Sequence, residues 1–340
     1  QGLASIFPIE AIQLHGLSEV LMRLPDLWQR IRATADAVVK ADPAVLVAID
    51  SPAFSLRVAK RVRRLAPRIP IVDYVSPSVW AWAPWRARRM KPFVDRLMAI
   101  LPFEPEVHRQ LGGPPTTYVG HPLTERLDSL QPRQGERTPG GPPVLLVLPG
   151  SRRSEVSRLM GRFGETVKLV ADRVGPIEVV LPAVDALADE IRAHAASWPV
   201  PPTIVTGEEA KHAAFRRARA ALAASGTVTL ELALTGVPMV VAYRVDVFLR
   251  ALKPLLRSKS IVLANLIAGE NAIPEFLDGD ATPEKLAAAL NPLLDETPER
   301  ARQIAAFGEI ERRMLAGEGT PSGRAADIVL AAMRPRAAAR

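Results

Sequence analysis

The chain has 340 residues, of which 48% are hydrophobic and 24% charged, a composition typical of a globular protein. Its length favours two domains, and no apolar run reaches the roughly 18 residues that a membrane-spanning helix needs. The absence of cysteine excludes disulfides, thiol catalysis and cysteine-ligated metals. A net charge of +8 favours anionic partners, although a composition rich in arginine and alanine produces the same excess.

The chain begins at Gln1 rather than at a methionine, and no secretory signal is visible. We therefore expect that an N-terminal segment is missing. From there, short apolar runs alternate with helical patterns, which is typical of βαβ units and a parallel sheet. A helix is predicted at Phe54–Leu65, and the strands predicted in the first half are Val45–Asp50, Ile71–Val75, Leu97–Leu101 and Thr117–Gly120.

In open α/β sheets, ligands bind beyond the carboxyl ends of the strands, so polar residues that follow strands are candidate site residues. Asp50 ends the first strictly apolar strand. A carboxylate there can act as a general base. The other interpretation is a cap on the following helix, which is a common role for aspartate after a strand. From spacing alone, the cap is favoured.

The second strand leads into the most unusual segment, Ser76–Lys91, which holds three of the five tryptophans. Trp80 and Trp82 are two residues apart directly after a strand, so at least one is expected to pack inward. Pro84 can begin a helix, and Trp85, Met90 and Phe93 are then expected to share one side. The segment either packs in the core or forms a surface for a partner that is both apolar and anionic. The second alternative arises because its tryptophans are followed by the cations Arg86, Arg88, Arg89 and Lys91.

His121 follows the fourth predicted strand and is a candidate acid, base or substrate clamp, although a lone histidine is more often structural. A polar stretch rich in proline and glycine then runs from Asp128 to Pro143 and is the best linker in the chain. We therefore predict a first domain over residues 1–137, a second over 138–315 and a C-terminal helix and tail over 316–340.

The second half repeats the alternation and predicts a second doubly wound sheet, so the expected fold is α/β with two Rossmann-like domains. The segment from Pro283 onward is predicted to be helical. The predicted strands are Val144–Leu148, Ile177–Leu181, Thr203–Thr206, Ala221–Ala224 and Met239–Tyr243, and the predicted helices are Glu155–Val174, Asp185–Ala195, Glu208–Ala220 and Thr229–Leu234.

Two strand-to-helix turns in this half suit a phosphate. One carries Gly150, Ser151 and Arg152, and the other carries Ser225, Gly226 and Thr227. The first is equally readable as an ordinary βα turn with a serine cap. Glu231, one turn into the next helix, is either a partner for a ribose diol or a capping-box residue. Asn265, in the apolar loop 263–269, either orients a ligand or satisfies loop backbone. Neither a metal-ligand cluster nor a Gly-x-Gly-x-x-Gly motif occurs, which leaves metal-free chemistry on a nucleotide-linked substrate without a cofactor.

Taken together, these motifs resemble the lipid-A-disaccharide synthase family of inverting glycosyltransferases. That family has the GT-B architecture, in which two Rossmann-like domains face a cleft. The resemblance is collinear from residue 2 to about residue 315, and the Ser-Pro-Ser-Val-Trp-Ala-Trp run is the most specific match. The matching segments are Gly16–Leu21, Ile49–Phe54, Tyr74–Trp82, Ile100–Glu104, Val119–Pro122, Leu148–Arg152, Ala224–Thr227, Tyr243–Arg244 and Asn265–Gly269.

The resemblance implies transfer of 2,3-diacylglucosamine from its UDP derivative to 2,3-diacylglucosamine 1-phosphate. It makes Asp50 the expected base, with Arg152 on the pyrophosphate and Glu231 near the ribose. Ser151, Ser225, Gly226, Thr227 and Asn265 complete the implied UDP-sugar site, and Ser76, His121, Tyr243 and Arg244 line the implied acceptor side. Trp82, Trp85 and the four cations after them would contact an anionic membrane, which places the enzyme in the cytoplasm on the inner face of the inner membrane. The oligomeric state is left open.

Three departures stand against this resemblance. The family begins with a strand and a Gly-Glu-x-Ser-Gly-Asp loop, and this chain starts after both. The first domain is therefore expected to lack that opening unit, and whether the chain is active without it is left open. Ala53 stands where the family commonly has a second acid, and Glu270 where it usually has arginine.

Three other functions compete with the glycosyltransferase. One is another UDP-amino-sugar enzyme of the same fold, such as a 2-epimerase, which would not need the tryptophan-rich segment. Another is a non-catalytic nucleotide- or lipid-binding remnant. A nucleic-acid binder is disfavoured, because the basic residues are spread along the chain rather than banded.

Overall fold

The computed structural model describes residues 5–8, 24–133, 135–137, 141–243, 260–315 and 317–333. The chain forms two compact units, one of Gln1–Pro122 with Gly317–Arg340 and one of Leu123–Ala316. The division at Pro122 precedes the Pro/Gly-rich stretch 128–143, and the C-terminal segment belongs to the first unit. Among the described helices, none combines the length and the apolar character needed to cross a membrane.

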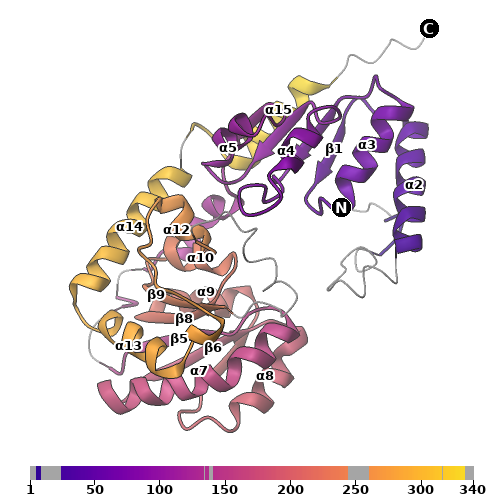
Figure 1. Cartoon of the computed structure of the whole chain (residues 1–340). Coiled ribbons are helices and arrows are strands. Elements are labelled where there is room, and N and C mark those ends of the chain that lie inside the picture. The colour runs from indigo at the N-terminus through magenta and orange to yellow at the C-terminus, as the bar shows by residue number, and fades with distance from the viewer. Residues whose placement is uncertain are drawn as a thin grey trace. The chain divides into compact units, whose positions relative to one another are not determined.

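The first unit is built on a sheet flanked by helices (Figure 1). The sheet is parallel, with the strand order β1-β2-β3-β4. The strands are β1 (Leu46–Ile49), β2 (Ile71–Tyr74), β3 (Arg96–Ala99) and β4 (Thr116–Tyr118), close to the predicted ranges. The helices are α2 (Leu24–Ala41), α3 (Ser55–Leu65), α4 (Trp85–Met90), α5 (Glu104–Gln110) and α15 (Pro321–Ala332).

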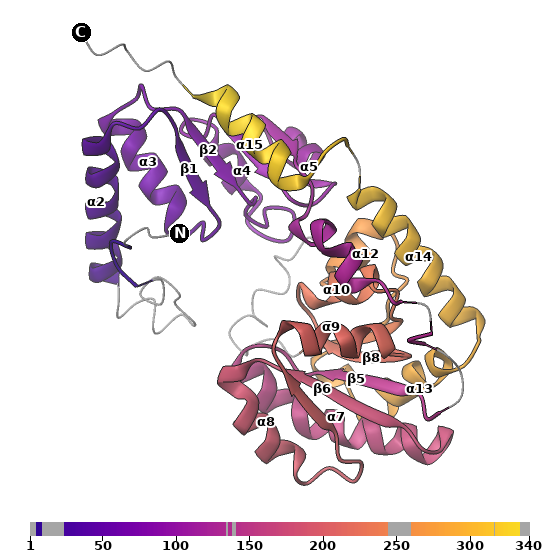
Figure 2. The ribbon, with the colours of Figure 1, turned by 180° about the vertical axis from the view of Figure 1, so that it is seen from behind.

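Helices cover both faces of this sheet. Successive strand residues point to opposite faces, so each strand contributes apolar side chains to both layers. Ile71 and Leu97 pack with α2 and α3 in one apolar cluster, while Val72 and Met98 pack against α15 on the other face. Figure 2 shows α15 lying along the strands. The guanidinium of Arg324 on α15 donates to the carbonyl of Val119 at 2.8 Å. The C-terminal helix is therefore part of the first unit's core.

The second unit holds a six-stranded parallel sheet with the order β10-β9-β8-β5-β6-β7. This is the strand order of a classical dinucleotide-binding fold, in which the order reverses between the first and fourth strands of the unit, here β5 and β8. The strands are β5 (Val144–Leu148), β6 (Glu178–Ala183), β7 (Thr203–Thr206), β8 (Ala220–Ala224), β9 (Met239–Tyr243) and β10 (Glu275–Leu277).

The helices of the second unit flank this sheet, and the two parallel sheets together confirm the predicted α/β class. They are α6 (Leu127–Leu130), α7 (Arg153–Val174), α8 (Ala188–Ala195), α9 (Glu208–Arg217), α10 (Val228–Leu234), α12 (Leu263–Ala268), α13 (Pro283–Leu294) and α14 (Pro298–Met314). The segment 263–268, which we expected to be a loop, is thus helical, and it ends at Gly269 with φ +76°.

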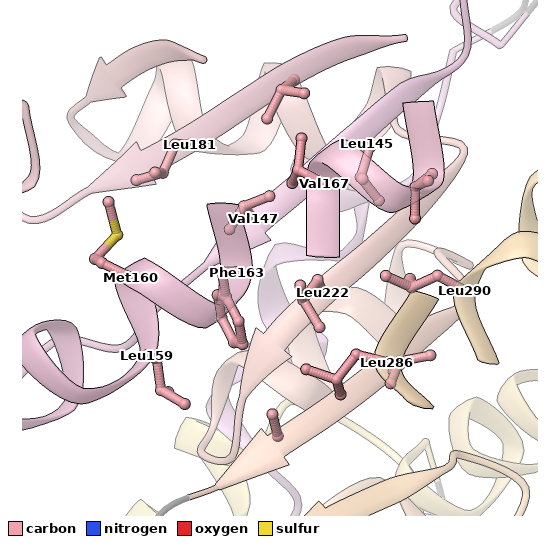
Figure 3. Close-up of a cluster of buried hydrophobic side chains, with 14 of the residues drawn as sticks. Leu145, Val147, Leu159, Met160, Phe163, Val167, Leu181, Leu222, Leu286 and Leu290 are labelled. Atoms are coloured by element: carbon pink, nitrogen blue, oxygen red, sulfur yellow. The ribbon is translucent and has the colours of Figure 1, made fainter. Parts of the chain in front are cut away.

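The core of the second unit lies between the sheet and helices α7 and α13 (Figure 3). Leu145 and Val147 of β5 point into it and meet Phe163 and Val167 of α7, all fully buried. Each such side chain contributes roughly 1.5–3 kcal/mol on burial. Strands that are covered on both faces are apolar along their whole length, as β5 is. This packing on both faces holds the carboxyl end of β5 in place.

The stretch after α6 is held to the second unit by one half-buried cation. The guanidinium of Arg137 donates to four main-chain carbonyls, those of Thr235 at 2.7 Å, Arg216 at 2.9 Å, Gly236 at 3.1 Å and Phe215 at 3.3 Å. Burial lowers the pKa of Arg137 to about 10. Because these bonds run from the Pro/Gly-rich stretch to α9 and α10, this stretch belongs to the second unit.

Candidate functional site

The second unit has a cavity of about 490 Å³ at the carboxyl ends of β5, β6 and β8. It lies at the point where the strand order reverses, which is where open α/β sheets bind ligands. The side walls come from the segments after these strands and from the start of α9. The lining residues are Leu148, Gly150, Ser151, Arg152, Glu155, Pro182, Ala183, Val184, Asp185, Gly207, Glu208, Lys211, Ala224, Ser225, Gly226, Thr227, Val228 and Glu231.

The turn after β5 depends on Gly150. Its φ is +108°, a conformation that favours glycine. A Cβ at this position would also lie 2.8 Å from the Cβ of Glu155, so there is no space for a side chain. The carboxylate of Glu155 accepts from the main-chain N–H of Ser151 at 3.2 Å and pairs with the guanidinium of Arg152 at 2.9 Å. Helix α7 is capped by this glutamate, and Arg152 is its N-cap residue, so the serine-cap interpretation of this turn is wrong.

The turn after β8 forms the opposite wall. The hydroxyl of Ser225 donates to the carbonyl of Ile261 at 2.9 Å, and that of Thr229 donates to the carbonyl of Gly226 at 2.9 Å. Glu231 lies in the cavity wall and pairs with the ammonium of Lys211 at 3.0 Å. It is therefore an ion-pair partner, and α10 has no side-chain cap among the described residues.

The cavity brings together Ser151, Arg152, Ser225, Gly226, Thr227 and Glu231, which lie in two segments far apart in the sequence. Lys211 was missed. It lies one turn into α9, after the carboxyl end of β7, and Gly207 before that helix has φ +84°. The position of Lys211 shortly after the predicted strand Thr203–Thr206 is the signal that could have identified it.

Asn265 lies outside the residues that line this cavity. Its amide nitrogen donates to the carbonyl of Ile273 and to the carboxylate of Glu275, both at 2.9 Å, and its amide oxygen accepts from the N–H of Ile273 at 2.9 Å. The side chain is buried and satisfies loop backbone. Glu270, just after the end of α12, pairs with Arg302 of α14 at 3.3 Å. Tyr243 is half-buried at the end of β9, while Arg244 and the segment Gly16–Leu21 lie outside the described residues.

In the first unit, Asp50 is exposed directly after β1, with φ +48°. Its main chain is tied at both sides, because its N–H donates to the carbonyl of Tyr74 at 2.9 Å and its carbonyl accepts from the hydroxyl of Ser55 at 2.6 Å. Helix α3 begins at Ser55 and has Phe54 as its N-cap, with no capping side chain among the described residues. The cap interpretation of Asp50 is therefore wrong. The guanidinium of Arg57 donates to the carbonyl of Ala53 in the same turn.

Ser76 and His121 are both buried. The hydroxyl of Ser76 lies 2.8 Å from Nε2 of His108 on α5. Burial lowers the pKa of both histidines to about 4, so each is neutral near pH 7. Gly120, just before His121, is packed under α15, since a Cβ there would lie 2.8 Å from Cγ of Pro321.

The tryptophan segment divides into a buried and an exposed part. Trp80 packs edge-on against Phe103 with ring centroids 5.6 Å apart, and its indole N–H donates to Glu104 at 3.3 Å. Burial raises the pKa of Glu104 to about 7, although bonds from Leu101 and Trp80 oppose the shift. Trp82 and Trp85 are 50% and 55% exposed. One tryptophan therefore packs inward, as expected.

The exposed part carries cations at close range. The guanidinium of Arg86 lies 5.3 Å from the ring centroid of Trp82, and Arg88, Arg89 and Lys91 are exposed. Burial, with repulsion from Arg57, lowers the pKa of Arg86. The expectation that Met90 and Phe93 share a side with Trp85 is wrong, since both pack into the core with α3 while Trp85 faces outward. Across the described residues, no three histidine, aspartate or glutamate side chains gather as metal ligands would.

Several solved structures share this fold. A MurG structure from Acinetobacter baumannii superposes with a TM-score of 0.59 at 14% identity, covering 90% of this chain and 78% of that one. A co-structure of S. aureus MnaA with UDP gives a TM-score of 0.60 at 13% identity, covering 92% and 81%. The two parallel sheets and these neighbours define a protein of the GT-B class.

The sequence comparisons are more specific. The family model described as Lipid-A-disaccharide synthetase matches residues 1–320. A lipid-A-disaccharide synthase of Rhodopseudomonas palustris (strain HaA2) is 54% identical over 337 residues, covering 98% of this chain and 86% of that protein. One from Nitrobacter hamburgensis is 53% identical over 338 residues, covering 98% and 85%. The chain therefore belongs to the lipid-A-disaccharide synthase family, and it is a glycosyltransferase of lipid A biosynthesis.

Proposed function

We propose that this protein transfers 2,3-diacylglucosamine from its UDP derivative to the 6-hydroxyl of 2,3-diacylglucosamine 1-phosphate. The products are the β-1,6-linked tetraacyl disaccharide 1-phosphate and UDP. The observation that carries the proposal is the cavity at the strand-order reversal of the second unit, where six residues predicted for a UDP-sugar site meet. Its cations and helix terminus suit a diphosphate, and its carboxylates suit hydroxyl groups.

The donor diphosphate is assigned to the turn after β5. Arg152 offers a planar guanidinium that can bind two phosphate oxygens, and α7, with 22 residues, presents main-chain N–H groups at its N-terminus. Lys211 adds a second positive charge in the same cavity. These groups would stabilise the negative charge that builds up on UDP as it leaves. Glu231 is assigned to the ribose hydroxyls, with the turn Ser225–Thr227 beside it.

The chemical step needs a base for the acceptor. Asp50 is assigned this role because its carboxylate is exposed at a strand end, while its main chain is held by Tyr74 and Ser55. Asp50 would accept the proton of the acceptor hydroxyl as that oxygen attacks the anomeric carbon. The bond from this carbon to the UDP oxygen breaks in the same step, which inverts the configuration and leaves UDP with the electron pair.

The exposed tryptophans support a contact with lipid. Trp82 and Trp85 are half exposed beside Arg86, Arg88, Arg89 and Lys91, an arrangement that suits the interface of an anionic bilayer. We assign this contact to the inner face of the inner membrane, with the protein in the cytoplasm. On this proposal the first unit serves the acceptor and the membrane, and the second unit holds the UDP-sugar.

A product assay tests the reaction. The protein is incubated with UDP-2,3-diacylglucosamine and 2,3-diacylglucosamine 1-phosphate in detergent micelles, and lipid products and UDP are measured by mass spectrometry. The proposal requires disaccharide 1-phosphate and UDP in equal amounts, dependent on both substrates. Free monosaccharide formed without the acceptor would instead indicate a 2-epimerase. Unchanged substrates, with UDP still bound, would indicate a protein that binds nucleotide without catalysis.

A further inference from the structure

One carboxyl group of the first unit is buried within the sheet itself. Asp73 lies on β2 and is 2% exposed, with Ala48 of β1 and Leu97 of β3 as its neighbours in register. Asp73 follows Ile71 by two residues on the same strand, so both side chains point to the same face of the sheet. Helices α2 and α3 cover that face with apolar side chains. The Oδ2 of Asp73 is buried and has no hydrogen-bond partner among the described residues.

This buried group lies next to the strand end that carries Asp50. The N–H of Asp50 bonds to Tyr74, the residue after Asp73. The backbone at this edge is strained, because Asp50, Ser51 and Val75 have φ of +48°, +44° and +76°. For a β-branched residue such as Val75 this conformation is a genuine outlier. Strain of this kind accumulates where the surrounding structure holds a functional arrangement in place.

The electrostatics of the pair are asymmetric. A carboxylate with an orphaned oxygen among apolar side chains is costly to ionise. Burial raises the pKa of Asp73 to about 8, and the negative charge of Asp50 adds to the shift. Arg57 lies in the first turn of α3, just after the strand end that carries Asp50, and Arg86 lies on α4. Their guanidinium groups repel one another, and Arg57 reaches the carbonyl of Ala53.

We propose that Asp73 holds a proton on its buried oxygen, so that the strand end carrying Asp50 does not receive a second negative charge. Like charges repel one another, so a protonated Asp73 spares this strand end the repulsion that another carboxylate would add. Asp73 is thus a positioning residue, which limits the negative charge near the base without contacting substrate. The inference rests on the proposed role of Asp50, but its first test does not depend on turnover.

The protonation state can be measured directly by infrared spectroscopy on protein labelled with ¹³C-aspartate. The proposal expects a protonated aspartate carbonyl band near neutral pH that disappears with a midpoint near pH 8. The band should be absent from Asp73→Asn and present in Asp36→Asn, a matched change at an exposed aspartate of α2. If wild-type protein shows no protonated aspartate near pH 7, the proposal is overturned, whether or not the Asn variant folds.

The functional consequence appears in the pH profile of kcat/KM. Ionisation of Asp73 would add a negative charge near the base, where it would repel the anionic acceptor phosphate and raise the KM for the acceptor. Wild-type kcat/KM should therefore fall about tenfold between about pH 7 and about pH 9. Asp73→Asn, whose side chain is neutral at all pH values, should not show this fall in kcat/KM, whereas Asp36→Asn should show it. A fall that persists unchanged in Asp73→Asn would refute the coupling. Full activity of Asp50→Ala would instead remove the base assignment, while the infrared result stands by itself.

Discussion

Lys211 and Glu231 form an ion pair of 3.0 Å in the wall of the second unit's cavity, with side chains 26% and 15% exposed. The pair joins α9, which follows β7, to α10, which follows β8. It places a positive and a negative group side by side in a cavity whose other charged lining residues are Arg152, Glu155, Asp185 and Glu208. A ligand with both phosphate and hydroxyl groups can therefore be bound at two chemically different ends.

Replacing Lys211 tests which end it serves. Lys211→Met should weaken UDP binding roughly tenfold, because it removes a charge-assisted contact to phosphate and leaves Glu231 without its partner. Binding of uridine should change much less. Calorimetric titration with UDP and with uridine gives both values. Lys168→Met, at an exposed pair on α7, is the control. An equal loss for both ligands would put Lys211 beside the nucleoside instead.

Arg152 and its neighbour offer a matched pair on adjacent positions. Arg152→Ala should weaken UDP binding by roughly 1.5–3 kcal/mol, the range for a charge-assisted hydrogen bond. Arg153→Ala should leave it nearly unchanged, because Arg153 pairs with Glu190 and does not line the cavity. Measured dissociation constants for UDP decide between them. Unchanged affinity in Arg152→Ala would mean that the diphosphate binds elsewhere.

Removing the carboxylate of Asp50 should separate chemistry from binding. Asp50→Ala should abolish formation of the disaccharide, since the acceptor hydroxyl loses its base, while UDP affinity stays nearly constant because the cavity belongs to the other unit. Turnover is measured from UDP release, with Asp36→Ala as the exposed control on α2. Near-wild-type turnover would contradict the assignment.

The exposed part of the tryptophan segment should control membrane binding. Trp85→Ala combined with Arg88→Ala and Arg89→Ala should weaken binding to phosphatidylglycerol vesicles by roughly 30-fold from the charges alone, at about 1 kcal/mol per arginine. Trp28→Ala with Lys168→Ala and Arg192→Ala removes the same residue classes and charge from other exposed positions. Vesicle sedimentation compares the two. Equal losses would indicate a nonspecific charge effect.

The burial of Glu104 predicts a pH dependence of stability. The folded-state pKa of Glu104 is about 7, against 4.5 unperturbed, so between these values the folded protein holds a proton that the unfolded chain has released. The unfolding free energy should therefore decrease from about pH 4.5 to about pH 7 relative to Glu104→Gln, in which this term is absent.

Urea unfolding of both proteins across this range measures the difference. The control is Glu106→Gln on the same helix, because hydrogen bonds from Arg109 and Gln110 lower the pKa of Glu106 to about 2, outside the window. A difference between wild type and Glu104→Gln that does not change with pH would show that Glu104 is ionised in the fold.

Much of the fold could be read from periodicity. Strands such as Val144–Leu148 are short, continuous apolar runs bounded by turn residues, and such runs are stable only inside a sheet covered on both faces. The same logic found Ser151 and Thr227, since a polar residue after a buried strand lies at the ligand-binding edge. It failed for Asn265, because a single buried amide can satisfy either a ligand or a loop, and sequence does not distinguish them.

By itself, the sequence determined the α/β class, most of the strands and the residues at the strand ends, because these follow from local alternation of apolar and polar positions. Only the tertiary structure decided which of those ends meet. The strand order places β8 beside β5, and so brings Glu231 to the cavity of Arg152, while α9, which follows β7, adds Lys211. It likewise buried Met90 and Asp73, and joined α15 to the first unit. These outcomes depend on long-range packing between segments far apart in the chain, which no local pattern encodes.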